Sequence, residues 1–137
     1  MRRLLLLTVA VLAVAVAAPA MASACNDTKY RVTEKLAWKS ITSSIETIDF
    51  EDEYTMEDTA PEAKAQAFRA RRILMTGAIP CSARKKRQRT YMLGVATMLY
   101  RAYNAAVIGD LDLAVTRMED ASAYIDLLQE AGFDTTY

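Results

Sequence analysis

A cluster of basic residues after Cys81 is the part of this 137-residue chain with the clearest chemical potential. Five cations fill six consecutive positions, and they are Arg84, Lys85, Lys86, Arg87 and Arg89. Ser82 is a favourable N-cap, so the cluster falls at the start of a predicted helix. A helix N-terminus already carries partial positive charge, and its unpaired amides attract anions. The cluster therefore predicts either a solvated basic surface or a site for phosphate or carboxylate groups.

Cys25 and Cys81 are the only cysteines in the chain. In an exported protein, two cysteines most economically form one disulfide. Two other states remain open at this stage, namely a lipid-modified Cys25 and a pair of free thiols. Bacterial lipoproteins usually have a bulky aliphatic residue three positions before the modified cysteine, where this chain has Ala22. The disulfide is therefore the favoured prediction.

The first 24 residues match the three-part pattern of a secretory signal peptide. Arg2 and Arg3 precede an apolar run, and small residues ending in Ala24 stand before Cys25. An uncleaved anchor is the alternative, but a membrane-spanning helix needs about 20 apolar residues, and Pro19 follows a shorter run here. We predict cleavage before Cys25 and export to the periplasm or the cell exterior. A lipoprotein held in the cell envelope through Cys25 is the alternative.

The mature chain, residues 25–137, is predicted to form one domain of four helices. Glycine and proline are scarce, and apolar residues recur at helical spacing. The predicted helices run from caps at 26–28 to about 48, over 61–75, from 82 to 108 and over 111–131. Thr59 and Pro61 predict the start of the second helix, so residues 49–59 are expected to be a loop. Residues after Gly132 are expected to fray. Short connections favour an all-α, up-down-up-down four-helix bundle.

In the last third of the chain, Gly109 and Asp110 are followed by Ala114, Met118 and Ala121. This spacing resembles the second helix of a tetratricopeptide repeat. No second copy occurs at the period of about 34 residues that defines the family. The resemblance therefore implies a helical hairpin and no particular partner.

Charge is strongly segregated along the chain. Residues 46–62 contain eight acids and no base, residues 63–109 contain ten bases and no acid, and residues 110–137 contain seven acids and one base. An up-down bundle returns the turn near residue 80 to the end that holds Cys25. That end should then be basic, and the acidic segment 49–58 should lie at the opposite end. The predicted anion-binding residues are Arg69, Arg72, Arg84, Lys85, Lys86, Arg87 and Arg89.

Several chemistries are excluded by composition. The chain has no histidine, which excludes a histidine-based triad and an imidazole-ligated zinc site. It has no C-x-x-C pair, phosphate-binding glycine loop or G-x-S-x-G elbow. We therefore expect no catalytic residues, no cofactor and no metal. The alternative is a small-molecule-binding protein or a histidine-independent enzyme acting on a small anion. That alternative would need a pocket enclosing Arg101 with Tyr100 or Tyr103.

The expected function is binding by an exported helical protein. Its basic end would contact an anionic membrane surface, an envelope polymer or an acidic protein. Nucleic acid is not expected, because only Tyr91 flanks the cluster and stacking aromatics are sparse. Two further outcomes are a head-to-tail homo-oligomer, in which basic and acidic ends of different copies pair, and a solvated basic end. In the second case the neutralising acids would be Asp126, Glu130 and Asp134.

Overall fold

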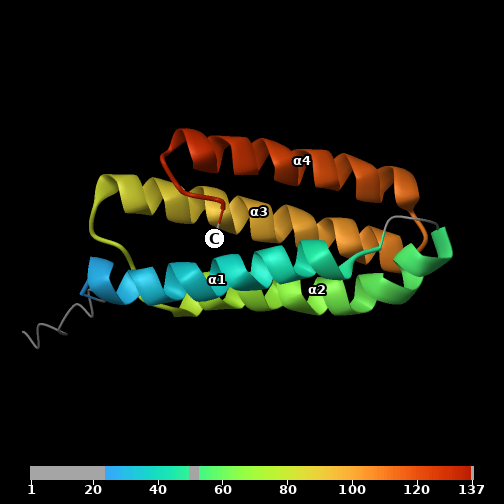
Figure 1. Ribbon diagram of the computed structural model, residues 1–137, viewed down its shortest axis with the longest axis horizontal. Helices are drawn as coiled ribbons and strands as arrows, with labels where there is room; N and C mark the ends of the chain where they lie inside the picture. The colour runs from blue at the N-terminus through green and yellow to red at the C-terminus, as the bar shows by residue number, and fades with distance from the viewer. Residues whose placement is uncertain (1–23, 50–52, 137) are drawn as a thin grey trace, which may run out of the picture.

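The structure, a computed structural model, describes residues 24–49 and 53–136. It contains four helices, α1 (Asp27–Thr47), α2 (Glu53–Thr76), α3 (Ala83–Val107) and α4 (Leu111–Glu130). The helices alternate in direction (Figure 1), and no strand occurs in those two ranges. The predicted all-α four-helix fold is therefore confirmed. The predicted signal peptide lies outside the described residues, except for Ala24.

Local sequence signals determine most of the helix ends. The side chains of Asn26, Ser82 and Asp110 cap α1, α3 and α4, each accepting a hydrogen bond from the backbone N–H three residues later at 2.9 to 3.2 Å. Gly109 and Gly132 follow the ends of α3 and α4 with φ angles of +79° and +81°. Residues that carry a side chain rarely adopt this left-handed backbone conformation, so glycine is the residue that allows both turns.

The second helix begins earlier than the sequence predicted. Residues 53–59 belong to α2, so the expected loop over 49–59 is wrong for most of its length. Pro61 lies inside the helix and not in its first turn. The hydroxyl of Thr59 accepts a hydrogen bond from the N–H of Asp49 at 3.0 Å, so the expected cap residue instead joins α2 to the end of α1. Acidic residues are favoured near a helix N-terminus, which makes this composition compatible with a helix start.

The two ends of the bundle differ in what they contain. The start of α1 and the turn between α2 and α3 lie at one end, which we call the disulfide pole because it holds Cys25 and Cys81. The α1–α2 and α3–α4 connections lie at the other end, which we call the far pole (Figure 1). The arrangement matches the one that the up-down topology predicted.

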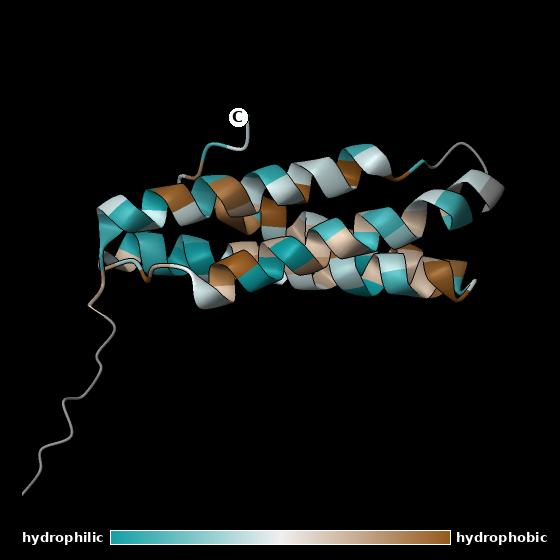
Figure 2. Ribbon diagram, turned by 90° about the horizontal axis from the view of Figure 1, so that it is seen from below, coloured by the Kyte–Doolittle hydropathy of each residue, from teal (hydrophilic) through white to brown (hydrophobic). Residues whose placement is uncertain are grey.

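Packing occurs between consecutive helices. Each helix packs against its neighbours in the sequence, and α1 also touches α3, but no Cα atom of α1 lies within 8 Å of a Cα atom of α4. Figure 2 shows hydrophilic and hydrophobic segments alternating along the helices, as amphipathic helices require. A Cβ at Gly94 would overlap the ring of Tyr124, so glycine permits the close approach of α3 and α4 there. The largest fully buried apolar and aromatic side chains are Tyr30, Ile41, Leu74, Met92, Leu99, Tyr103 and Leu128.

The segment after α4 folds back and contacts α1. The ring of Phe133 is buried and meets Trp38 edge to face, with ring centroids 5.2 Å apart. The N–H of Phe133 donates to the carbonyl of Leu128 at 3.1 Å. The expectation that the chain frays after Gly132 is therefore wrong at Phe133, because an aromatic pair stabilises the turn. This segment gives α1 a contact that α4 itself does not make.

Candidate functional site

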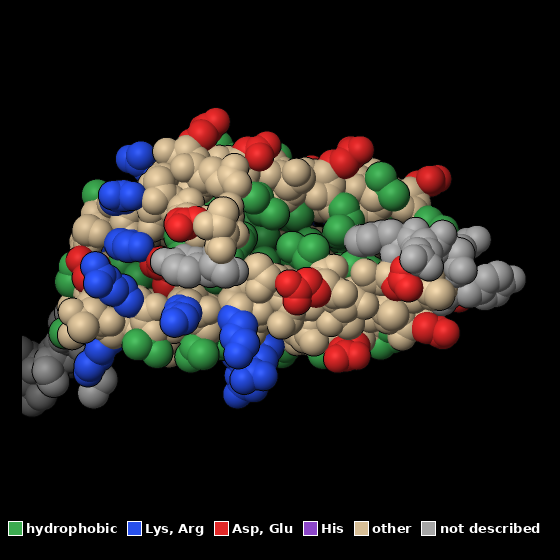
Figure 3. Space-filling model, in the orientation of Figure 1, with side chains coloured by type: hydrophobic (Ala, Val, Ile, Leu, Met, Phe, Trp, Pro, Cys, Tyr) green, Lys and Arg blue, Asp and Glu red, His purple; other side chains and the backbone are tan. Residues whose placement is uncertain are grey.

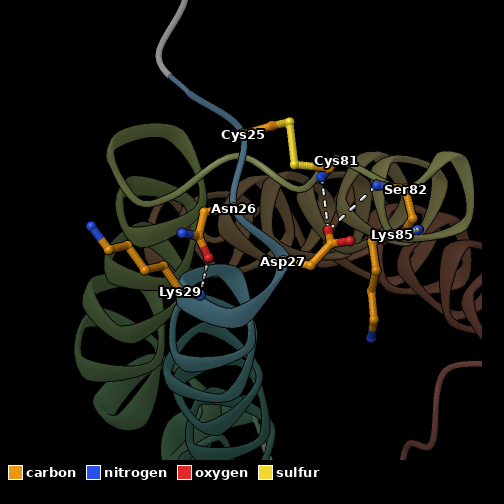
Figure 4. The surroundings of a disulfide bond; sticks show 7 residues. All are labelled: Cys25, Asn26, Asp27, Lys29, Cys81, Ser82 and Lys85. Carbon is orange, nitrogen blue, oxygen red and sulfur yellow. Dashed lines mark hydrogen bonds between the residues drawn. A yellow bond between two sulfur atoms is a disulfide. The ribbon is translucent and has the colours of Figure 1, made fainter.

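A disulfide joins Cys25 to Cys81 at the disulfide pole, with Cα atoms 4.9 Å apart. Figure 4 shows that the side chain of Asp27 lies beside this bond. One carboxylate oxygen of Asp27 accepts hydrogen bonds from the N–H of Cys81 at 2.7 Å and of Ser82 at 3.4 Å. The predicted pairing is confirmed, and neither sulfur is a free thiol. The start of α1 is thus linked to the start of α3 by a covalent bond and by a carboxylate.

The predicted anion-binding residues are placed on the two helices that meet at this pole. Arg69 and Arg72 lie in the last turns of α2, and the cluster 84–89 forms the first turns of α3. Figure 3 shows Lys and Arg side chains gathered toward the disulfide pole, whereas Asp and Glu side chains lie toward the far pole and along α4. The cations therefore gather at one end of the molecule, whereas the acids occupy the far pole and the length of α4.

Two of the seven predicted residues cap other helices. The guanidinium of Arg84 donates to the carbonyls of Ala131 and Gly132 at 3.3 and 2.8 Å, at the end of α4. The guanidinium of Arg89 donates twice to the carbonyl of Leu74 at 3.2 and 2.8 Å, near the end of α2. The last carbonyls of a helix lack partners within the helix, so each arginine supplies donors that α2 and α4 need.

A third predicted residue, Lys85, forms an ion pair with Glu34 of α1. Its Nζ donates to both carboxylate oxygens, at 2.9 and 3.0 Å. The side chain of Glu34 is only 6% exposed, and that of Lys85 is 28% exposed. A buried carboxylate is costly without a cation beside it, so this lysine is a structural partner of α1. Three of the clustered cations therefore have internal roles that offset their position at a helix N-terminus.

The other four predicted residues have no such role. Lys86 and Arg87 on α3, and Arg69 and Arg72 on α2, are exposed and make no side-chain hydrogen bond or ion pair within residues 24–49 and 53–136. α1 adds exposed cations that sequence reasoning missed, some in its first turns and Lys39 near its middle. The topology could have indicated those in the first turns, because it brings the start of α1 to the same pole. We use the term free cations for the combined set, which is Lys29, Arg31, Lys35, Lys39, Arg69, Arg72, Lys86 and Arg87.

The described acids near this pole form no ion pair with the free cations. Asp27 accepts backbone hydrogen bonds and Glu34 pairs with Lys85. Hydrogen bonds from Thr136 lower the pKa of Asp134, which stays a carboxylate. In the described part of the chain, none of the expected neutralising acids is within ion-pair distance of a cation, and these acids are Asp126, Glu130 and Asp134.

Two buried tyrosines have strongly raised pKa values. Burial raises the pKa of Tyr103 to about 12, and the hydrogen bond at 3.3 Å with the hydroxyl of Ser44 acts in the opposite direction. Burial also raises the pKa of Tyr30, and the charge of Glu34 adds to that effect while Arg89 opposes it. Both phenols are therefore neutral at physiological pH, and they act as core side chains.

A hollow of about 240 Å³ lies between α3 and α4 near the far pole. Tyr100, Arg101, Asn104 and Arg117 contribute its polar lining, whereas Tyr103 is buried in the core. The guanidinium of Arg117 donates to the carboxylate of Asp120 at 3.0 Å. Within the described ranges, no group of three cysteine, histidine or acidic residues is arranged to hold a metal ion.

No protein-family model, curated protein sequence or solved structure matches this chain significantly. The fold and the site define a class of molecule, a small four-helix protein with one disulfide and a basic pole. Disulfides form and persist in oxidising compartments outside the cytosol. Among the helices that the structure describes, none has the length and apolar character needed to cross a membrane.

Proposed function

We propose that this chain is an exported binding protein whose disulfide pole engages an anionic partner. The observation that supports this proposal is the division of charge at that pole. Two of its acids, Asp27 and Glu34, are occupied by contacts inside the fold. The exposed acids at the end of α4 form no ion pair with the free cations, which come from three helices and have no internal partner among the described residues. Clustered unpaired cations create a positive potential that attracts anionic partners and speeds their association.

Export is part of the proposal. The signal-peptide pattern before Cys25 and the disulfide to Cys81 both fit a chain that folds outside the cytosol. The anionic groups available to such a chain are lipid phosphates, envelope polymers and the carboxylates of acidic proteins. Binding and not catalysis is proposed, because the free cations are not accompanied by a nucleophile with an adjacent base.

A binding measurement on the oxidised mature chain tests the proposal. The probes are lipopolysaccharide, polyphosphate, and vesicles of phosphatidylcholine with or without phosphatidylglycerol, each at low and moderate salt. We expect binding to the anionic probes that weakens as salt screens the charges. The variant Lys86→Glu/Arg87→Glu should weaken binding by about tenfold or more, given about 1 kcal/mol for each cation near an anionic surface.

A matched control separates the pole from the net charge. The single variant Lys64→Glu, compared with Arg87→Glu, changes the net charge by the same amount on a part of α2 away from the cluster 84–89. It should bind like the wild type. The proposal is wrong if no anionic probe binds at low salt, or if Lys64→Glu loses as much affinity as Arg87→Glu.

A second copy of the chain is the competing partner for the basic pole. In that case the apparent mass should rise with protein concentration at low salt, and Glu57→Lys/Asp58→Lys at the far pole should prevent the rise. Both exposed acids lie on α2 near the far pole. If the chain self-associates in this way and binds none of the anionic probes, the partner of the basic pole is a second copy of the chain and not an external anion.

The hollow beside Arg101 favours a second candidate function, the binding of a small anion. Arg101 and Arg117 could pair with a carboxylate or phosphate, and Tyr100 and Asn104 could orient it. Calorimetric titration with inorganic phosphate and small dicarboxylates tests this candidate. Binding that disappears in Arg101→Ala and survives in Lys86→Glu/Arg87→Glu would support it. The absence of binding, or its survival in Arg101→Ala, would exclude it.

A further inference from the structure

The outer face of α1 has an apolar stripe between lysines. Lys29, Val32, Leu36 and Lys39 follow one another at spacings of three and four residues, which places them on one side of the helix. Val32 is 62% exposed and Leu36 is 50% exposed, so the fold leaves both side chains in contact with solvent. This stripe faces the groove between α1 and α2.

Two shallow hollows follow this groove. The first, of about 460 Å³, is lined by Lys29, Val32, Leu36 and Ile73 together with the turn after α2. The second, of about 350 Å³, is lined by Leu36, Ile73, Lys39 and Arg69 together with polar residues. Because Leu36 and Ile73 line both hollows, these form one continuous trough.

We call this surface the basic trough, and its residues are Lys29, Val32, Leu36, Lys39, Arg69 and Ile73. Its centre is apolar, and its two ends hold the cations. None of the described residues that line either hollow is acidic. The end that holds Lys29 adjoins the turn after α2 at the disulfide pole, so the trough is continuous with the free cations there.

We propose that the basic trough docks on an anionic lipid bilayer. The lysines and Arg69 would bind lipid phosphates, and Val32 and Leu36 would enter the boundary between headgroups and acyl chains. This inference rests on the proposed function and names its partner. Interfacial helices combine apolar residues on one side with flanking lysines and arginines whose stems extend toward the headgroups. The trough has this combination on α1.

The free cations favour a bilayer over an acidic protein as the partner. They lie on three helices, and no hydrogen bond within the described residues holds their side chains in one geometry. A folded acidic protein binds best when its carboxylates match cations that are held in fixed positions. Lipid headgroups diffuse laterally, so they can pair with cations at any position on the surface. Apolar side chains beside the cations then add a contribution that salt does not screen.

Two exposed apolar residues on α4 supply the control. Val115 is 56% exposed and Leu127 is 38% exposed, against 62% and 50% for Val32 and Leu36. α4 contains five acids and one base, so an anionic bilayer should repel it. Replacing these two residues by serine therefore removes comparable apolar surface without touching the trough.

The experiment measures partition of the oxidised mature chain onto sedimented vesicles of phosphatidylcholine with phosphatidylglycerol, and in parallel its binding to polyphosphate, which has no acyl chains. We expect Val32→Ser/Leu36→Ser to lower vesicle partition by about tenfold and to leave polyphosphate binding unchanged. Val115→Ser/Leu127→Ser should leave both unchanged. Lys39→Glu/Arg69→Glu should lower vesicle partition by about tenfold or more. Circular dichroism checks that each variant is folded.

The possible failures are distinguishable. Vesicle partition that is unaffected by Val32→Ser/Leu36→Ser would overturn docking through the trough and leave the anionic partner of the basic pole in place. The same holds if polyphosphate binds and vesicles do not, or if an acidic amphipathic peptide competes with vesicles and binds more tightly. If neither probe binds, the trough and the proposed function both fail.

Discussion

The cations on the two sides of the first turns of α3 differ in what they contact. Arg84, Lys85 and Arg89 point toward other helices and bind the end of α4, a buried carboxylate of α1 and the end of α2. Lys86 and Arg87, between them in the sequence, are exposed, and their side chains make no hydrogen bond or ion pair with a described residue. A single run of charge therefore contains structural residues and residues available to a partner.

The helical register explains this difference. Met92 and Leu99 are buried on the inner side of α3, and stepping back by seven residues from Met92 reaches Lys85. Gln88 lies on the same side, is buried, and donates to the carbonyl of Ala131 at 2.9 Å. Lys86 and Arg87 fall outside this stripe. Charge density alone thus overestimates the number of cations that an external anion can use.

Loss of the disulfide should produce the largest change in the free energy of unfolding, because the bond holds the start of α3 against the start of α1. The bond closes a segment with a sequence separation of 56 residues. The chain-entropy model then gives a stabilisation of about 4 kcal/mol. We expect Cys25→Ser/Cys81→Ser to lower the free energy of unfolding by about that amount in urea melts. A change below about 1 kcal/mol would show that Asp27 and the helix packing hold the pole without the bond.

The ion pair on the inner side should give the next largest effect. Lys85→Met removes the partner of the buried Glu34 carboxylate, and we expect a loss of about 3 kcal/mol of unfolding free energy. Lys86→Met on the outer side should change it by less than about 0.5 kcal/mol. The double variant Lys85→Met/Glu34→Met should recover most of the loss, because it leaves no uncompensated charge. If Lys85→Met and Lys86→Met lowered the free energy of unfolding equally, the inner and outer lysines of α3 would not differ in their contribution to stability.

Much of the fold was predictable from local signals. The caps at Asn26, Ser82 and Asp110 act within three residues, and the glycines after α3 and α4 have the positive φ that glycine readily adopts. The start of α2 was not predictable in this way, because Thr59 and Pro61 resemble a helix start. The contact from Asp49 to Thr59 is tertiary and leaves no local pattern.

The candidate site was predictable only as a region. Alternating helix directions correctly placed Cys25, Cys81 and the cluster 84–89 at one pole. The internal roles of Arg84 and Arg89 depend on carbonyls at the ends of α4 and α2, and a sequence does not show which helix ends lie within reach of a guanidinium. The position of Lys85 on the extension of the apolar stripe was a usable signal.

The dependence of stability on alkaline pH tests the buried phenol of Tyr103, which has no charged partner. Burial raises the pKa of Tyr103 to about 12, above the ordinary value of 10.0. The folded chain therefore holds this proton more tightly than the unfolded chain does. The contribution of Tyr103 to stability is complete below about pH 10 and is lost as the pH rises toward about 12, by up to about 3 kcal/mol. Burial also raises the pKa of Tyr30 and adds to the fall, so Tyr103→Phe should make the fall in urea melts smaller and not abolish it. A fall of the same size in wild type and variant would assign it to other groups.

Removal of an arginine cap should have the smallest effect on the free energy of unfolding. It also tests most directly the comparison between the inner and outer cations of α3. Arg84→Ala leaves the carbonyl of Gly132 without its side-chain donor and leaves that of Ala131 with Gln88 alone, and we expect a loss of about 1–2 kcal/mol of unfolding free energy. Arg87→Ala removes the same guanidinium three residues later on the outer side, so it should change stability by less than about 0.5 kcal/mol. Binding to anionic vesicles should show the opposite order, since Arg87 is free and Arg84 is held by α4. If both variants lost stability equally and vesicle affinity equally, the cations of α3 would act as one group and the internal contacts of Arg84 would have no measurable weight.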